Sequence, residues 1–142
     1  MSDGKLEGKF LLAGGVAELV VAALHFLMPL SLDKSAGIAG VPMEYRSFLD
    51  LATFSVGICM IALGALSIYY SQRLSQADRV WWLFSLSQGL LWVGRAVLEL
   101  ILPVRIPLFS FSSPTRVILP AILVVAMLFL VPVLVPYKGV PE

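Results

Sequence analysis

Residues 11–30 read LLAGGVAELVVAALHFLMPL, an apolar run whose only ionisable side chains are Glu18 and His25. A helix that crosses the hydrocarbon core of a bilayer needs about 20 mostly apolar residues. Three further runs meet this condition, at residues 47–70, 80–103 and 117–135. We therefore predict an all-α integral membrane protein, a four-transmembrane-helix antiparallel bundle that forms a single domain over residues 1–142. The first run is longer than the core of a signal peptide and has Glu18 at its centre, so we expect it to be retained.

The composition leads to the same class of protein. Of the 142 residues, 59% are hydrophobic and 13% are charged, whereas soluble domains are usually about 45–50% apolar and about 25% charged. A short chain cannot bury such an excess, which argues against a soluble enzyme, a secreted disulfide scaffold and a disordered chain. The net charge is +1 and the basic residues are dispersed, so we expect no nucleic-acid partner. The single Cys59 excludes an intrachain disulfide and a cysteine-based cluster.

Basic residues outside the spans indicate how the bundle is oriented. Five of them lie on the side of the termini and four on the other side. The first group is Lys5, Lys9, Arg73, Arg79 and Lys138, and the second is Lys34, Arg46, Arg105 and Arg116. By one charge, the positive-inside rule favours both termini in the cytoplasm. The expected location is a bacterial-type plasma membrane.

Four charged side chains fall within the predicted spans, namely Glu18, Asp50, Arg95 and Glu99. A charge at the bilayer centre costs roughly 2.5–3.5 kcal/mol on insertion scales, so these side chains are expected to face the bundle interior. Glu18 and His25 are seven residues apart and share one face of their helix.

The third span carries a polar stripe along one side. Its members follow a three-four spacing and are Ser85, Gln88, Trp92, Arg95 and Glu99. Arg95 and Glu99 lie at i and i+4, within reach of a salt bridge. On the second span, Asp50, Gly57 and Gly64 share a face, where the glycines allow close approach of a neighbouring backbone.

The depths of these residues predict a pocket in one leaflet. Because the helices alternate in direction, His25, Asp50, Arg95 and Glu99 are all displaced from the midplane toward the side of loops 31–46 and 103–116. Glu18 lies near the midplane and would form the floor, and the two loops would form one covered face. Arg46 and Arg105 flank the predicted mouth, where they would attract an anionic head group.

Structural roles for the same residues stay open beside the functional ones. Arg95 and Glu99 are explained by a structural ion pair, and Asp50 by contacts with the helix start and head-group water. Glu18 has no cation on its own helix, so it must pair across helices or carry a proton. With His25 neutral, the charges of the ionised span residues sum to −2, a net charge that a dry pocket will not hold; these residues are Glu18, Asp50, Glu99 and Arg95.

We expect the pocket to bind a hydrophobic, lipid- or isoprenoid-like small molecule, with membrane lipids around it. The predicted catalytic residues are Glu18, His25, Asp50 and Glu99, and the predicted ligand-binding residues are Gln88, Trp92, Arg95, Arg46 and Arg105. A protonated carboxyl beside a neutral imidazole suits acid–base chemistry, namely isomerisation, cyclisation or epoxide opening. If the protein is an enzyme, it is expected to be a cofactor-independent isomerase, cyclase or hydrolase.

We predict no cofactor and no metal centre. Carboxylate di-iron bundles need repeated Glu-x-x-His pairs, which this sequence lacks. One histidine cannot supply bis-histidine haem ligation. A single ion held by His25 with a nearby carboxylate is the alternative that these counts leave open.

Two other functions fit the same residues. The first is an accessory or scaffold subunit of a membrane complex, or a homodimer, in which the polar residues tie helices together. The second is a proton-coupled transporter, because GGVAELV at residues 14–20, with Glu18, resembles the glutamate-bearing first helix of small multidrug resistance transporters. The resemblance covers this stretch alone, and Arg95 within a span departs from what a cation-extruding pore would favour.

Overall fold

The computed structural model describes residues 3–32, 40–73, 80–103 and 113–134. They form four helices: α1 (Asp3–Leu32), α2 (Met43–Ser71), α3 (Val80–Ile101) and α4 (Thr115–Leu134). Each helix is long and apolar enough to cross a membrane, which confirms the predicted all-α, four-helix membrane bundle. The predicted runs match these helices to within a few residues, except that α1 starts at Asp3 rather than near residue 11. No proline precedes Leu11, so the helix continues into the polar N-terminal sequence.

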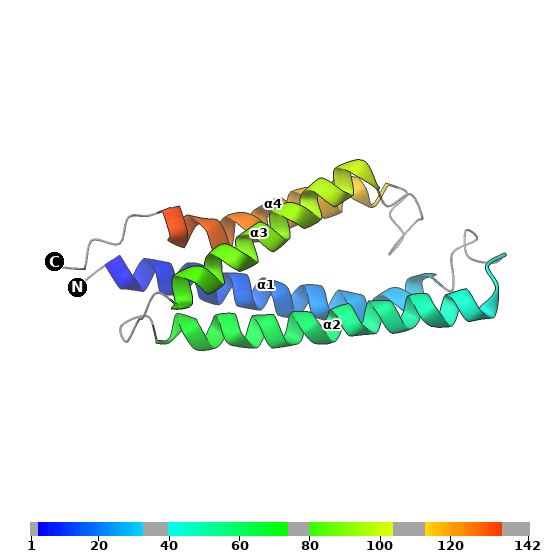
Figure 1. Cartoon of the computed structure of the whole chain (residues 1–142), viewed down its shortest axis with the longest axis horizontal. Helices are drawn as coiled ribbons and strands as arrows, with labels where there is room; N and C mark the ends of the chain where they lie inside the picture. The colour runs from blue at the N-terminus through cyan, green and yellow to red at the C-terminus, as the bar shows by residue number, and fades with distance from the viewer. Residues whose placement is uncertain (1–2, 33–39, 74–79, 104–112, 135–142) are drawn as a thin grey trace.

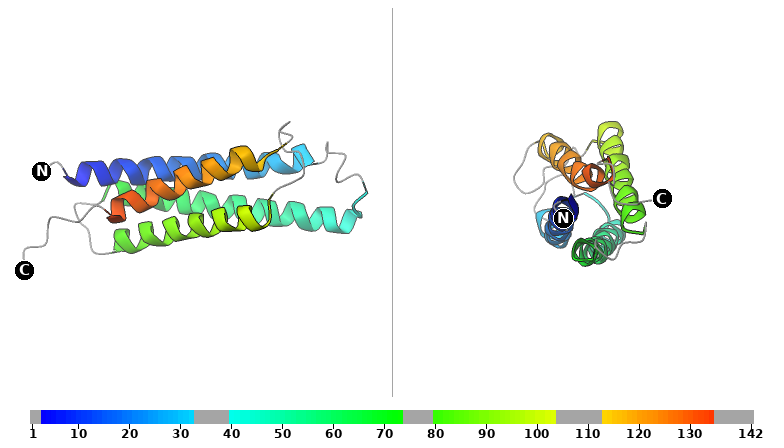
Figure 2. Two further views of the ribbon diagram at one scale, coloured as in Figure 1. Left: turned by 90° about the horizontal axis from the view of Figure 1, so that it is seen from above. Right: turned by 90° about the vertical axis from the view of Figure 1, so that its left-hand side faces the viewer.

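The helices run alternately up and down as two hairpins. α1 packs against α2 and α4, and α3 packs against α4; the α3–α4 pair crosses over the α1–α2 pair (Figures 1 and 2). α1 and α3 end, and α2 and α4 begin, at the same end of the bundle, which we call the loop end. The direction of the helices thus agrees with the prediction that both longer loops belong to one side. Most of that predicted cover, residues 33–39 and 104–112, lies outside the described residues.

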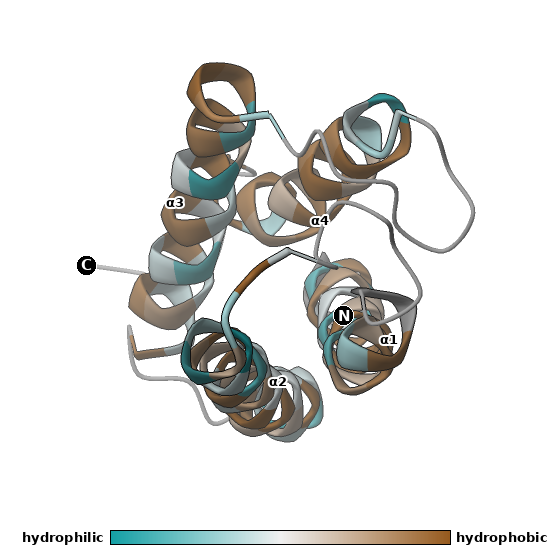
Figure 3. Ribbon diagram, turned by 90° about the vertical axis from the view of Figure 1, so that its right-hand side faces the viewer, coloured by the Kyte–Doolittle hydropathy of each residue, from teal (hydrophilic) through white to brown (hydrophobic). Residues whose placement is uncertain are grey.

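Apolar side chains cover the outside of the bundle, and polar ones are found inside. Large residues such as Leu30, Leu98 and Val124 are exposed, as expected where lipid is the solvent. In Figure 3, α3 is brown on its outer side and paler or teal on the side turned toward the other helices. The buried polar residues of the described segments are Glu7, Glu18, Ser67, Ser85, Gln88 and Glu99.

Glycines bring α1 and α2 into backbone contact. A Cβ added at Gly15 would lie 2.8 Å from the carbonyl oxygen of Gly64, and one added at Gly64 would lie 2.8 Å from that of Gly15. Gly57 lies about two helical turns closer to the loop end and faces Phe26 and His25 of α1. The predicted close approach of a neighbouring backbone is therefore confirmed at Gly64, where it holds the α1 face that carries Glu18 against α2, whereas Gly57 lies against side-chain atoms of α1.

Contacts between α3 and α4 fix which side of α3 faces inward. The Ser85 hydroxyl donates to the carbonyl oxygen of Phe129 at 2.6 Å, and Gly89 leaves room for the side chain of Leu130. This pairing orients α3 so that Gln88 and Trp92 are turned into the bundle, where both are buried.

Candidate functional site

Glu18 joins three helices near the middle of the bundle. Its side chain is completely buried. The indole Nε1 of Trp92 in α3 donates to its Oε1 at 3.2 Å, and the hydroxyl of Ser67 in α2 lies 3.1 Å from its Oε2. The carboxyl therefore finds its partners across helices, one of the two outcomes that the sequence predicts for it.

The hydrogens available around Glu18 fit a neutral carboxylic acid. The Ser67 hydroxyl has one hydrogen, yet it lies within hydrogen-bond distance of two acceptors, Glu18 Oε2 and the carbonyl oxygen of Leu63 at 2.9 Å. If Glu18 carries a proton on Oε2, it donates to Ser67 Oγ, and Ser67 donates to Leu63. Every group then has a partner, and no net charge is left in the middle of the bundle.

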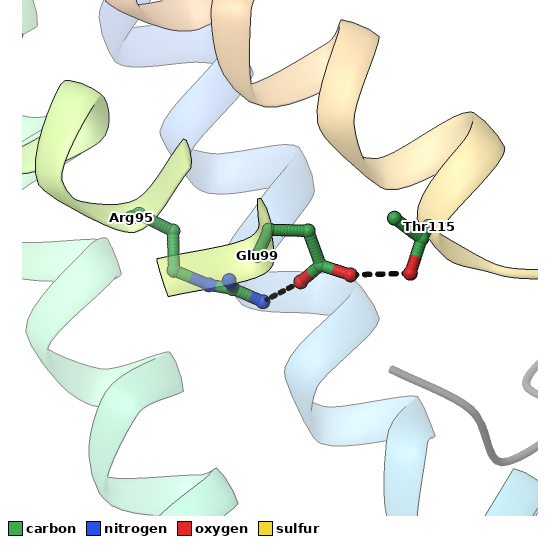
Figure 4. Close-up of polar contacts among 3 residues, drawn as sticks. All are labelled: Arg95, Glu99 and Thr115. Atoms are coloured by element: carbon green, nitrogen blue, oxygen red, sulfur yellow. Dashed lines mark hydrogen bonds and ion pairs between the residues drawn. The ribbon is translucent and has the colours of Figure 1, made fainter. Parts of the chain in front are cut away.

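Glu99 is held from two sides at the loop end of α3. Arg95 Nη2 lies 2.8 Å from Glu99 Oε2, so the predicted ion pair is formed. The hydroxyl of Thr115, the first residue of α4, donates to Glu99 Oε1 at 2.6 Å (Figure 4). Glu99 is completely buried and Arg95 is 39% exposed, so the pair combines an enclosed carboxylate with an accessible guanidinium.

We expect Thr115→Val to lower the free energy of unfolding by about 1 kcal/mol, since interhelical hydrogen bonds in membrane proteins average about 0.6 and reach about 1.7 kcal/mol. Thr115→Ser keeps the hydroxyl beside Glu99 and is expected to stay within a few tenths of the parent. SDS titration in mixed micelles measures both variants. A loss equal in the two would assign the effect to the threonine methyl group instead.

Gln88 is a buried polar residue whose side-chain oxygen lacks a hydrogen-bond partner among the described residues. Its side chain is 5% exposed, and its Oε1 has no hydrogen-bond partner among the described residues. It lies one turn from Trp92, on the interior side of α3. A buried acceptor without a partner costs about 1–3 kcal/mol, so the position of this amide lowers the stability of the bundle unless a donor binds to it.

The structure does not unite all the predicted catalytic residues. His25 is partly buried, and its Nδ1 lies 2.8 Å from the carbonyl oxygen of Val21 in its own helix. In the described residues no hydrogen bond or ion pair joins His25 to Glu18. Asp50 is also partly exposed and has no hydrogen bond or ion pair to another described residue. Their catalytic roles therefore stay predictions.

The two arginines predicted at the mouth differ in what the structure says of them. Arg46 lies in the first turn of α2, where its Nε donates to the carbonyl oxygen of Val41 at 2.9 Å. It is thus at the loop end, as predicted. Arg105 lies outside the described residues.

Two residues of the polar clusters were not predicted from the sequence. Ser67 lies three residues beyond Gly64, on the face of α2 that contacts α1, so extending the Asp50–Gly64 stripe by one turn would have found it. Thr115 precedes the predicted fourth span, and it follows Ser113 and Pro114, residue types that are typical of loops. No signal in α4 itself indicates that its first residue binds Glu99.

The helix pairing leaves one side of the bundle less closed than the others. α2 and α3 make few close backbone contacts in the described residues, and a ring contact between Tyr70 and Phe84, at 5.1 Å between centroids, joins them away from the loop end. By helical spacing, Arg95 lies on nearly the same side of α3 as Phe84, closer to the loop end. Gln88 lies between these two positions.

Comparison with known proteins finds no relative of this chain. No family model matches the chain, and neither a curated protein nor a solved structure matches it.

Proposed function

We propose that this membrane-embedded bundle is a binding protein for a lipid-like small molecule, which enters from the bilayer between α2 and α3 and places its polar group on Gln88. The observation that carries the proposal is the enclosed amide of Gln88, whose Oε1 has no partner among the described residues. Ionisable and polar side chains inside membrane spans are rare and most often mark a functional path or site. A ligand donor would complete the hydrogen bonding of this amide.

The neighbouring residues support a ligand at this position. Trp92 is buried one turn from Gln88 and presents an indole to the interior, and Arg95, two turns from Gln88, has N–H groups beyond the one that meets Glu99. Exposed apolar side chains surround the helices, so an apolar molecule reaches the side between α2 and α3 without leaving the lipid. The polar end of the molecule is then the part that needs the protein.

Glu18 has a positioning part in this proposal. Both of its oxygens are engaged, by Trp92 and Ser67, and its side chain is completely buried. The carboxyl therefore holds the indole of Trp92 in place, and Gln88 rather than Glu18 receives the ligand. Acid–base chemistry on the ligand is not needed for binding and is a separate proposal.

Gln88→Leu is expected to separate ligand binding from stability. Without ligand, the variant should be more stable than the parent by about 1 kcal/mol, because it removes a buried acceptor that has no partner. It should also lose labelling by a photoreactive, diazirine-bearing neutral lipid in vesicles. SDS titration and mass spectrometry of the labelled protein measure the two effects.

Ser87→Leu is the matched control, because Ser87 is exposed and its hydroxyl donates only to the carbonyl oxygen of Leu83, at 2.8 Å. This variant should keep the labelling of the parent. Undiminished labelling of Gln88→Leu, with the label on the same peptides, would overturn the proposed function.

A further inference from the structure

The polar group of the ligand can be inferred from the atoms that would meet it, and this inference rests on the proposed function. The geometry points to an uncharged lipid-like molecule with a hydroxyl group on its chain and an ester or carbonyl oxygen nearer the loop end. The hydroxyl would donate to Gln88 Oε1, and the second oxygen would accept from Arg95.

The first step is the need for a donor at Gln88. Its Oε1 is a buried acceptor without a partner among the described residues, and acceptors are completed only by N–H or O–H groups. A purely hydrocarbon chain, an ether or an ester offers no such hydrogen. A hydroxyl does.

The second step is the charge around the site. Arg95 is already neutralised by Glu99, with 2.8 Å between Nη2 and Oε2. The other charged side chains described toward the loop end are Glu44, Arg46, Asp50 and Arg116, two acidic and two basic. With Glu18 neutral, the described residues from Gln88 to the loop end carry no surplus charge, so neither an anionic nor a cationic polar group gains by entering there.

The third step is the acceptor for Arg95. A guanidinium carries five N–H hydrogens in a fixed plane, and the ion pair with Glu99 uses one nitrogen, Nη2. Gln88 and Arg95 are seven residues apart, or about 10 Å along the helix axis at 1.5 Å per residue. A chain that carries a carbonyl oxygen near one end and a hydroxyl near its middle has both groups at this separation.

The inference is tested by competition against the photoreactive lipid, with the parent protein in vesicles. The competitors are the methyl ester of a mid-chain hydroxystearic acid, its O-methyl ether, methyl stearate and the free hydroxystearate anion. The hydroxy ester is expected to compete at least about tenfold better than the ether and methyl stearate, the ratio for one hydrogen bond of about 1.4 kcal/mol. It should also compete better than the anion. Where the Gln88→Leu variant still takes up some label, the hydroxy ester should compete no better than the ether or methyl stearate.

The outcomes distinguish this inference from the proposed function. If the lipid labels the parent through Gln88 but the ether competes as well as the hydroxy ester, the hydroxyl assignment is wrong and the binding function stands. If the anion competes best, the uncharged class is wrong. If no competitor displaces the label and Gln88→Leu is labelled as strongly as the parent, the proposed function fails together with the inference.

Discussion

Gly64→Leu should destabilise the bundle by about 3 kcal/mol, the upper part of the usual range for overpacking a close contact. Already a Cβ at this position would lie 2.8 Å from the carbonyl oxygen of Gly15 and 3.1 Å from Leu19. Backbone oxygen cannot rotate away as a flexible side chain can, so α1 and α2 must separate along the face that carries Glu18. SDS titration in mixed micelles measures the loss.

Gly94→Leu is the matched control for this prediction. A Cβ at Gly94 meets no atom within 4 Å, and replacing a helical glycine removes a propensity cost of up to about 1 kcal/mol. We therefore expect Gly94→Leu to be neutral or mildly stabilising. Equal losses in the two variants would mean that the backbone contact between Gly15 and Gly64 does not hold the α1–α2 pair together.

The separation of α1 from α2 should also reach the interior polar groups. Ser67 lies one turn from Gly64, and its hydroxyl is 3.1 Å from Glu18 Oε2. A shift of a few tenths of an ångström lengthens this contact beyond good hydrogen-bond geometry. Gly64→Ala, a smaller change, should therefore affect both helix packing and the Glu18 cluster, which act as one unit.

Helical periodicity was sufficient to predict the parts of the site that share one helix. The stripe from Ser85 to Glu99 and the Arg95–Glu99 pair follow from a period of 3.6 residues, and the structure bears them out. The same period places Gly57 and Gly64 on one face of α2, although it does not say that α1 packs there. Such a pattern says which residues share a face, because the backbone fixes that relation locally.

Contacts between helices could not be predicted in the same way. Whether Trp92 reaches Glu18 depends on the rotation and axial shift of α3 relative to α1, which no spacing within either helix encodes. Extending the Asp50–Gly64 stripe reaches Ser67 but does not predict its contact with Glu18, because a helical serine commonly bonds to its own backbone, as Ser67 does with Leu63 at 2.9 Å. His25 shares a face with Glu18, but its ring bonds to Val21 instead. Periodicity thus shows which residues share a helix face, but not which of them bond to one another or to another helix.

Glu18→Leu should lower the free energy of unfolding by about 2–3 kcal/mol, since a buried donor left without an acceptor costs about 1–3 kcal/mol. The substitution keeps much of the side-chain volume but leaves the indole N–H of Trp92 without its acceptor, now 3.2 Å away. It also removes the contact with Ser67. The two hairpins then lose the polar contact through which α1 holds α3, so labelling at Gln88 should fall as well.

Glu18→Gln provides the sharper comparison, because a carboxamide, like a neutral carboxylic acid, has one oxygen that accepts and one group that donates. Its oxygen accepts from Trp92 and its NH₂ donates to Ser67, which donates to the carbonyl oxygen of Leu63. We expect this variant to stay within about 0.5 kcal/mol of the parent, the size of a substitution that keeps its contacts. If instead Glu18→Gln loses as much stability as Glu18→Leu, the bundle requires a negative charge at Glu18. The neutral interior, and with it the uncharged class of ligand, would then be wrong.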